Sequence, residues 1–314
     1  MIKKIMEQSE LVSQPPVFVD VGASGNIHDS WKLLAPYSIC IGFDGDVRET
    51  DFIESENSGY KKLYIFNKIV SESSKDTEFY LTSSPFCSSR LEPNQEELKN
   101  WAFGGLFEVE KKITMQSTTI NEILKQLDLD YIDWFKTDSQ GTDLRIYDSI
   151  DSNILNKIII AEFEPGIINA YKEEDKLYKI IEYMDKKDFW MSKMAVKGSQ
   201  RISQDNFKKY FSNYIEKLHN FAFLQEPSAS WAEVTYINSF KNDKLLSKRD
   251  LLLGCAISLA NKQYGFAIDL ATKAKQYYDD NIFDEILSYS INKIKGRKYL
   301  MYYYRVINKL KSFF

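Results

Sequence analysis

Short apolar runs recur along the first 240 residues of the chain, and amphipathic stretches separate many of them. The clearest run is 17–21, where four of the five residues are apolar. A run of this kind is typical of a strand that is buried on both faces, as in a parallel sheet. Similar patterns predict further strands at 38–43, 63–66, 77–82, 107–116, 131–135, 157–161, 189–196 and 231–237, and the apolar pattern after the third strand continues at 69–70.

Between these runs, apolar residues recur at helical spacing. Thr119-x-x-Glu122 is a capping box, which predicts a helix that continues to residue 127. Further helices are expected to start near 27–31 and to cover 143–150, 175–187 and 204–220. Strands that alternate with helices predict an α/β fold with a central sheet.

The pattern changes to helices alone after about residue 245. Two apolar faces flank a break at 261–263 and predict a close helical hairpin. A tetratricopeptide-like pair and a helical appendage packed on the sheet both fit this pattern. We therefore expect an α/β domain over residues 1–240 and an all-α extension over 241–314.

The turn after the first strand contains candidate chemistry. Asp20 is followed by Gly22 and Gly25, and this strand and glycine turn would let backbone N–H groups approach a nucleotide-like ligand. The spacing is not G-x-G-x-x-G, so no pyrophosphate cradle is indicated. A carboxylate next to the glycines suits a positive amino or sulfonium group instead, and S-adenosylmethionine has both.

The second strand ends in another acidic turn, Asp44-Gly45-Asp46. An acid about 20 residues after the glycines can hold two ribose hydroxyls. An ordinary βαβ unit with acids in its loops is the alternative. The predicted cofactor-binding residues are Asp20, Gly22, Ala23, Ser24, Gly25, Asp44, Gly45 and Asp46.

Composition excludes several classes of function. The net charge of −4 gives no indication of nucleic-acid binding, and three dispersed cysteines with two histidines do not indicate a structural zinc site. The chain begins without the apolar run of a signal peptide and has no run of 18 apolar residues. We expect a reduced, cytoplasmic protein.

Two segments suggest contacts with other molecules. The loop-rich stretch 83–106 is either a surface excursion or a source of substrate contacts. Residues 297–314 have apolar positions at helical spacing among basic residues. Such a helix suits peripheral contact with the inner, anionic face of a membrane, or it covers protein through the same apolar face.

Four motifs together resemble the FkbM family of S-adenosylmethionine-dependent methyltransferases. They are Asp20-Val21-Gly22-Ala23, Gly42-Phe43-Asp44, Lys136-Thr137-Asp138-Ser139-Gln140-Gly141-Thr142-Asp143 and Glu162-Phe163-Glu164. The resemblance covers roughly residues 15–240 and implies a Rossmann-like class I methyltransferase sheet. The chain departs from it at Asp44 and Asp143, where the family usually has Glu, and in the glycine spacing of the first motif.

The resemblance implies methyl transfer to a hydroxyl of a sugar, glycan or other small-molecule acceptor. Asp138 is then the predicted base or substrate anchor, with Lys136 and Glu162 as further catalytic candidates. A Mg²⁺ site on Asp138, Glu162 and Glu164 is not predicted, because carboxylates alone do not specify one. A nicotinamide oxidoreductase and an inactive scaffold remain alternatives, and the oligomeric state stays open.

Overall fold

The computed structural model describes residues 1–23, 27, 30–46, 59–211, 225–241 and 246–298. The chain divides into two compact units. The larger unit joins residues 17–26 to residues 39–239. The second unit joins residues 1–16, 27–38 and 240–314, so it draws on both ends of the chain.

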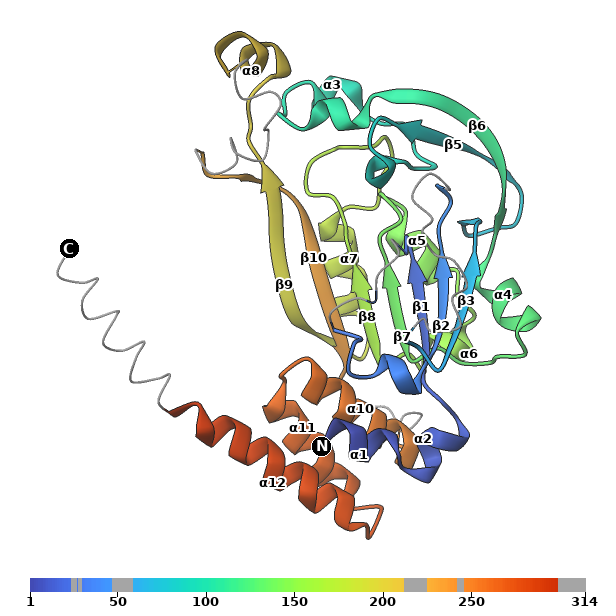
Figure 1. Ribbon diagram of the computed structural model, residues 1–314, viewed down its shortest axis with the longest axis vertical. Helices are drawn as coiled ribbons and strands as arrows, with labels where there is room; N and C mark the ends of the chain where they lie inside the picture. The colour runs from blue at the N-terminus through green and yellow to red at the C-terminus, as the bar shows by residue number, and fades with distance from the viewer. Residues whose placement is uncertain (24–26, 28–29, 47–58, 212–224, 242–245, 299–314) are drawn as a thin grey trace, which may run out of the picture. The chain divides into compact units, whose positions relative to one another are not determined.

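A seven-stranded sheet forms the centre of the larger unit, in the order β3-β2-β1-β7-β8-β10-β9 (Figure 1). Neighbouring strands are parallel from β3 to β8, whereas β10 runs antiparallel to both β8 and β9. The strands are β1 (Val17–Val21), β2 (Ile39–Phe43), β3 (Lys62–Phe66), β7 (Trp134–Thr137), β8 (Ile160–Phe163), β9 (Phe189–Ser199) and β10 (Ser228–Asn238). The predicted α/β class, with a mostly parallel central sheet, is confirmed.

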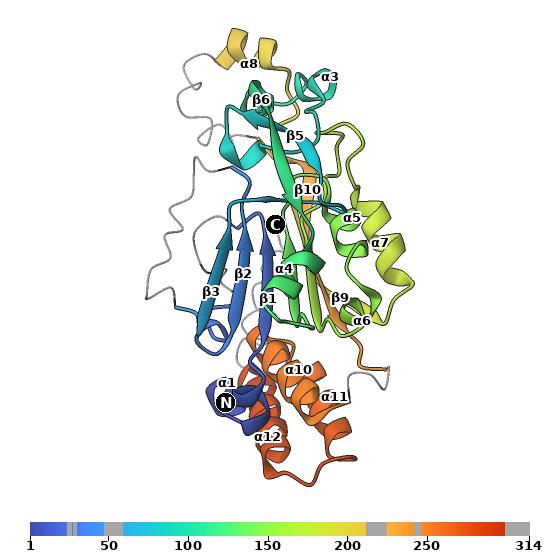
Figure 2. The same ribbon diagram turned by 90° about the vertical axis from the view of Figure 1, so that its right-hand side faces the viewer.

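Four helices supply apolar side chains to the core on one face of this sheet (Figure 2). They are α4 (Ile120–Gln126), α5 (Asp143–Asp148), α6 (Ser152–Leu155) and α7 (Leu177–Asp185). Ile123, Tyr147 and Met184 from these helices are buried in the same core cluster as Val19 and Phe135 of the sheet. The predicted capping box is present, since the Thr119 side chain accepts a hydrogen bond from the backbone N–H of Glu122.

A smaller sheet, ordered β4-β6-β5, lies at the carboxyl ends of the central strands (Figure 1). Its strands are β4 (Ile69–Val70), β5 (Asp76–Thr82) and β6 (Val109–Thr118). The loop-rich stretch between β5 and β6 contains η3 (Pro85–Cys87), α3 (Gln95–Leu98) and η4 (Gly104–Phe107), and α8 (Gln204–Phe211) follows β9.

Two predicted elements differ from the structure. The strand predicted at 131–135 is β7 at 134–137, because pairing with β1 decides where the strand lies, while Asp133 accepts a hydrogen bond from Val17 N. The helix predicted to start near 27–31 is absent from the described residues there. Turns and η1 (Ala35–Tyr37), with Pro36 in its first turn, take its place.

The second unit is helical. Its helices are α1 (Ile2–Met6), α2 (Ser9–Ser13), α10 (Lys248–Ala260), α11 (Tyr264–Ala274) and α12 (Asn281–Gly296). The predicted hairpin is α10 and α11, where Gly254 permits close packing because a Cβ there would lie 3.1 Å from Leu270 Cδ1 of α11. Lys248 joins three segments of this unit through ion pairs to Glu10 and Asp280.

Most of the predicted basic tail, 299–314, lies outside the described residues. The predicted helix at 204–220 is described only as far as residue 211. Within the described residues, no helix combines the length and apolar character needed to cross a membrane.

Candidate functional site

A cavity of about 130 Å³ lies at the carboxyl ends of β1, β2 and β7. Open α/β sheets bind ligands at this edge. Its wall contains the predicted site residues Gly22, Asp44, Gly45, Asp46 and Asp138. The other lining residues are Val21, Phe43, Lys68, Ile69, Val70, Phe79, Pro85, Phe86, Ser88, Arg90, Ser139, Gln140 and Thr142.

The turns after β1 and β7 meet at Gly22. Its φ is +83°, and a Cβ added there would lie 2.2 Å from the backbone oxygen of Asp138. The N–H of Gly22 donates to Phe43 O over 2.9 Å, and the N–H of Asp138 donates to Val21 O over 2.8 Å. Glycine is therefore required here to bring two motifs, far apart in the sequence, into backbone contact.

The acidic turn after β2 supplies hydrogen-bond acceptors to the cavity. Oδ1 of Asp44 accepts a hydrogen bond from Asp46 N at 2.8 Å, which fixes the turn locally. Asp46 is buried and Gly45 packs beside Ile69. Carboxylates in this position can accept hydrogen bonds from ligand hydroxyls or amines.

Asp138 is half-buried in the cavity wall. Burial raises the pKa of its carboxyl well above the ordinary value, and the neighbouring charges of Glu164 and Asp143 raise it further. Lys136 and a hydrogen bond from Gln140 Nε2, 2.5 Å from Asp138 Oδ1, act in the opposite direction. A carboxyl with a raised pKa beside a cavity is suited to proton transfer.

The remainder of the Lys136–Asp143 motif builds the turn that carries Asp138. The fully buried Asp143 accepts hydrogen bonds from Thr137 Oγ1 at 3.1 Å and from Ser139 N at 2.9 Å. Its other oxygen accepts from Glu164 N at 3.1 Å, which links the turns after β7 and β8. Asp143 therefore has a structural position in this site, behind the cavity wall.

Three predicted residues form a row across the sheet and do not line the cavity. Asp20, Lys136 and Glu162 are register partners on β1, β7 and β8. Lys136 Nζ lies 2.9 Å from Asp20 Oδ1, whereas Glu162 accepts hydrogen bonds from Trp134 Nε1 and Thr235 Oγ1. Burial alone would lower the pKa of Lys136, but the Asp20, Asp138 and Glu162 carboxylates raise it, so the amine stays charged.

The remaining predicted residues are placed as follows. Ala23 is buried beside Gly42 and is not part of the cavity wall. Ser24 and Gly25 lie outside the described residues. Across the described ranges, no cluster of three or more His, Cys, Asp or Glu side chains is arranged to hold a metal ion.

Sequence reasoning did not identify the cations of the cavity wall. Lys68 and Arg90 line it, together with Pro85, Phe86 and Ser88. Four of these five residues come from the 83–106 stretch, whose loop-rich composition was the one available signal. Their side chains add aromatic and basic groups to a cavity wall that also contains the acids after β2 and β7.

No family model, curated protein or solved structure matches the chain. The function is therefore inferred from the fold and from the chemistry of the cavity. Both are properties of the larger unit alone.

Proposed function

We propose that the protein is an S-adenosylmethionine-dependent O-methyltransferase that acts on a hydroxyl of a sugar, glycan or other small-molecule acceptor. The observation that carries this proposal is the cavity itself. It gathers the glycine turn after β1, the acidic turn after β2 and Asp138 after β7 at one edge of a parallel sheet.

The lining residues fit an adenosine-type cofactor. Asp44 and Asp46 offer carboxylate oxygens for ribose hydroxyls, and Phe43, Ile69 and Phe79 offer apolar surface for a base. The acidic groups at the ends of β2 and β7 favour a cofactor that presents cationic groups to them. The sulfonium and amino groups of S-adenosylmethionine meet that requirement.

The bound cofactor would supply an electrophilic methyl group. Asp138 would orient the acceptor hydroxyl and accept its proton as the oxygen attacks the methyl carbon, which requires the ionised carboxylate. Lys136 supports that ionised form through its charge. Lys136 and Glu162 would act from the sheet and not by touching the acceptor, since neither lines the cavity.

The sheet order supports this proposal over a nicotinamide oxidoreductase. A dinucleotide-binding sheet has six strands in the order 3-2-1-4-5-6. Here the antiparallel β10 is inserted between β8 and β9. Such an insertion is typical of the class I methyltransferase sheet that the sequence resemblance implies.

Cofactor binding is tested by calorimetry with S-adenosylmethionine and with NADH, and by mass spectrometry for S-adenosylhomocysteine that co-purifies with the protein. Asp44→Ala should weaken S-adenosylmethionine binding roughly 10–150-fold, since it removes a charge-assisted hydrogen bond. Asp205→Ala is the matched control, because Asp205 is exposed on α8 and does not line the cavity. Heat from NADH alone would favour the oxidoreductase, and no heat from either ligand would favour an inactive scaffold.

The role of Asp138 is tested by Asp138→Asn, which keeps the shape of the side chain but cannot accept the proton. We expect a loss of about 10²–10⁴ in the rate of transfer, with S-adenosylmethionine binding largely kept. Transfer at the wild-type rate would show that Asp138 is not the base.

A further inference from the structure

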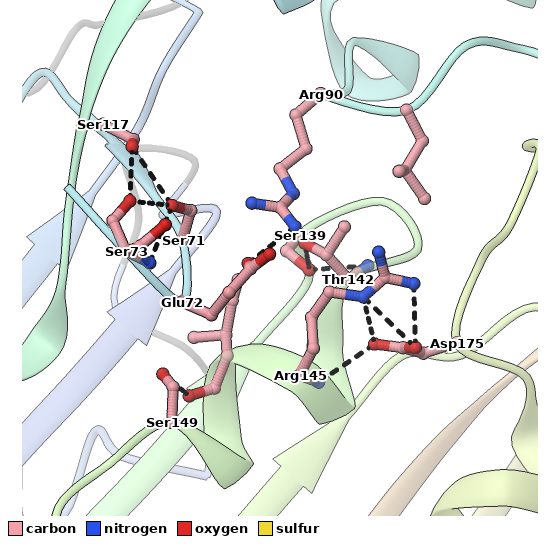
Figure 3. Close-up of polar contacts among 12 residues, drawn as sticks. Ser71, Glu72, Ser73, Arg90, Ser117, Ser139, Thr142, Arg145, Ser149 and Asp175 are labelled. Atoms are coloured by element: carbon pink, nitrogen blue, oxygen red, sulfur yellow. Dashed lines mark hydrogen bonds and ion pairs between the residues drawn. The ribbon is translucent and has the colours of Figure 1, made fainter. Parts of the chain in front are cut away.

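Arg90 places a buried cation in the cavity wall. Its side chain is only 10% exposed, although the residue belongs to the loop after η3. It lines the cavity together with Ser139, Thr142 and Asp138. Figure 3 shows its side chain extending from the loop toward Glu72, beside Ser139. A buried guanidinium requires partners for its five N–H donors.

The neighbouring Arg145 is an arginine whose guanidinium makes several hydrogen bonds to protein acceptors. Its Nε and Nη2 atoms donate to both carboxylate oxygens of Asp175 at 3.0–3.3 Å, and Nη2 also donates to Glu173 O at 2.5 Å. Figure 3 shows this fork-like pairing. Arg145 does not line the cavity, so it serves to fix the turn at Asp175.

Arg90 is engaged much less completely. Within the described part of the chain, its polar partner is Glu72, whose Oε2 lies 2.6 Å from Nη2. Nε and Nη1 make no hydrogen bond to an acceptor among those residues, and Arg90 lines the cavity. The Glu72 side chain is 42% exposed, so this partner sits at the solvent side of the pair.

Glu72 is itself held as a carboxylate. Burial would raise its pKa, but its own backbone N–H, Arg90 and Arg145 lower it below the ordinary value. The Glu72 carboxylate pairs with Nη2 of Arg90. The other N–H groups of the guanidinium can therefore bind a second anion. Arginine binds carboxylate and phosphate groups in this two-pronged manner.

We infer that Arg90 binds an anionic group of the acceptor, a carboxylate or a phosphate, in the cavity that it lines. The same wall has Phe79 and Phe86, and Phe86 is 62% exposed, which offers apolar surface to the body of the same molecule. The exposed Lys68 adds positive charge at this wall. The anion site rests on the cavity alone, whereas its assignment to the acceptor rests on the proposed methyl transfer.

The test is calorimetric titration of the full-length protein with inorganic phosphate, glucose 6-phosphate, glucuronate and neutral glucose. Glucose 6-phosphate and glucuronate should each bind at least about tenfold more tightly than glucose. The tighter of the two identifies the anionic group. Equal affinity for glucose and for both charged sugars would overturn the proposal.

Three variants locate the site. Arg90→Gln should weaken binding of the charged sugars about 10–100-fold, and Glu72→Gln should strengthen it by removing the competing carboxylate. Arg201→Gln, an exposed arginine outside the cavity wall, should bind like the wild type. If folded Arg90→Gln binds the charged sugars as tightly as the wild type does, the proposal is overturned. Unchanged affinity of Glu72→Gln for these sugars would also overturn it. If Arg90→Gln does not fold, Glu72→Gln alone decides.

S-adenosylmethionine is titrated into the same proteins. Anion binding without S-adenosylmethionine binding would leave the anion site standing and remove the proposed methyl transfer. Binding of S-adenosylmethionine with no preference for charged sugars would remove the anion site and leave the proposed methyl transfer standing.

Discussion

Gln140 donates a hydrogen bond from Nε2 to Asp138 Oδ1 over 2.5 Å while its own backbone has a φ of +55°. Residues other than glycine rarely adopt a positive φ, and backbone strain of this kind is common at functional sites. Surrounding groups hold it in place, since Ser89 Oγ donates to Gln140 O at 2.8 Å and Tyr171 Oη lies 2.9 Å from Gln140 Oε1. Gln140 is therefore a positioning residue for Asp138.

Gln140→Leu should make the protein less stable as the pH rises. The folded state binds the Asp138 proton more tightly than the unfolded state does, because its folded pKa is raised above the ordinary 3.8. Stability is thus lost as the pH rises through the window between the ordinary and the raised pKa. Gln140→Leu removes a hydrogen bond to the ionised carboxylate, so the folded pKa of Asp138 rises further and this pH window extends upward. At high pH the variant should therefore lose about 1.5–3 kcal/mol more folding stability than the wild type.

The measurement is the apparent Tm by circular dichroism between about pH 5 and pH 9. Asp138→Asn removes the titrating group and should be more stable than the wild type at high pH. In the Asp138→Asn background, Gln140→Leu should shift the Tm equally at every pH. A pH-dependent shift in that background would assign the effect to another group.

The Asp20–Lys136 pair should be strongly coupled in stability. The two side chains are 10% and 17% exposed, so each single substitution, Asp20→Asn or Lys136→Met, should cost about 3–5 kcal/mol. The double variant should cost less than the sum, because it leaves no unpaired buried charge. Denaturant unfolding of the four proteins measures the coupling.

The exposed pair Lys172–Glu92 is the control for that cycle, since its side chains are 55% and 49% exposed. Lys172→Met should cost no more than about 1 kcal/mol. Additive costs for Asp20→Asn and Lys136→Met would show that their charges do not interact.

Gly22→Ala should destabilise the larger unit and open the contact between the turns after β1 and β7. The left-handed φ alone costs about 1–3 kcal/mol for a residue with a Cβ, and the 2.2 Å approach to Asp138 O adds to it. Thermal unfolding measures the loss. Gly105→Ala is the matched control, since its Cβ would meet its nearest atoms at 3.9 and 4.0 Å, and a similar Tm for the two variants would contradict the proposed contact.

Hydrophobic patterning predicted the α/β class and most strands because strong apolar runs specify buried strands whatever surrounds them. It placed the strand at 131–135 too early, because the register with β1 decides the paired residues and cannot be read locally. It also predicted a helix near 27–31, where the described residues form turns and η1.

The candidate site was predictable where residues follow strand ends. Gly22, Asp44 and Asp138 share the cavity because parallel strands end at the same edge. The separation of Asp20 and Lys136 from the cavity depends on side-chain pairing across the sheet. Arg90 was not predictable, because its partner Glu72 lies in another loop and no local spacing reports that contact.

The contact between Gly22 and Asp138 has a consequence for redesign of the protein. The part of the cavity wall at Gly22 and Asp138 is fixed by backbone hydrogen bonds to Phe43 and Val21, which tolerate little change. Another part of the wall comes from side chains at 85–90, on a loop outside the central sheet. Exchange of that loop would alter which molecules the cavity accepts while leaving intact the groups that would perform the chemistry.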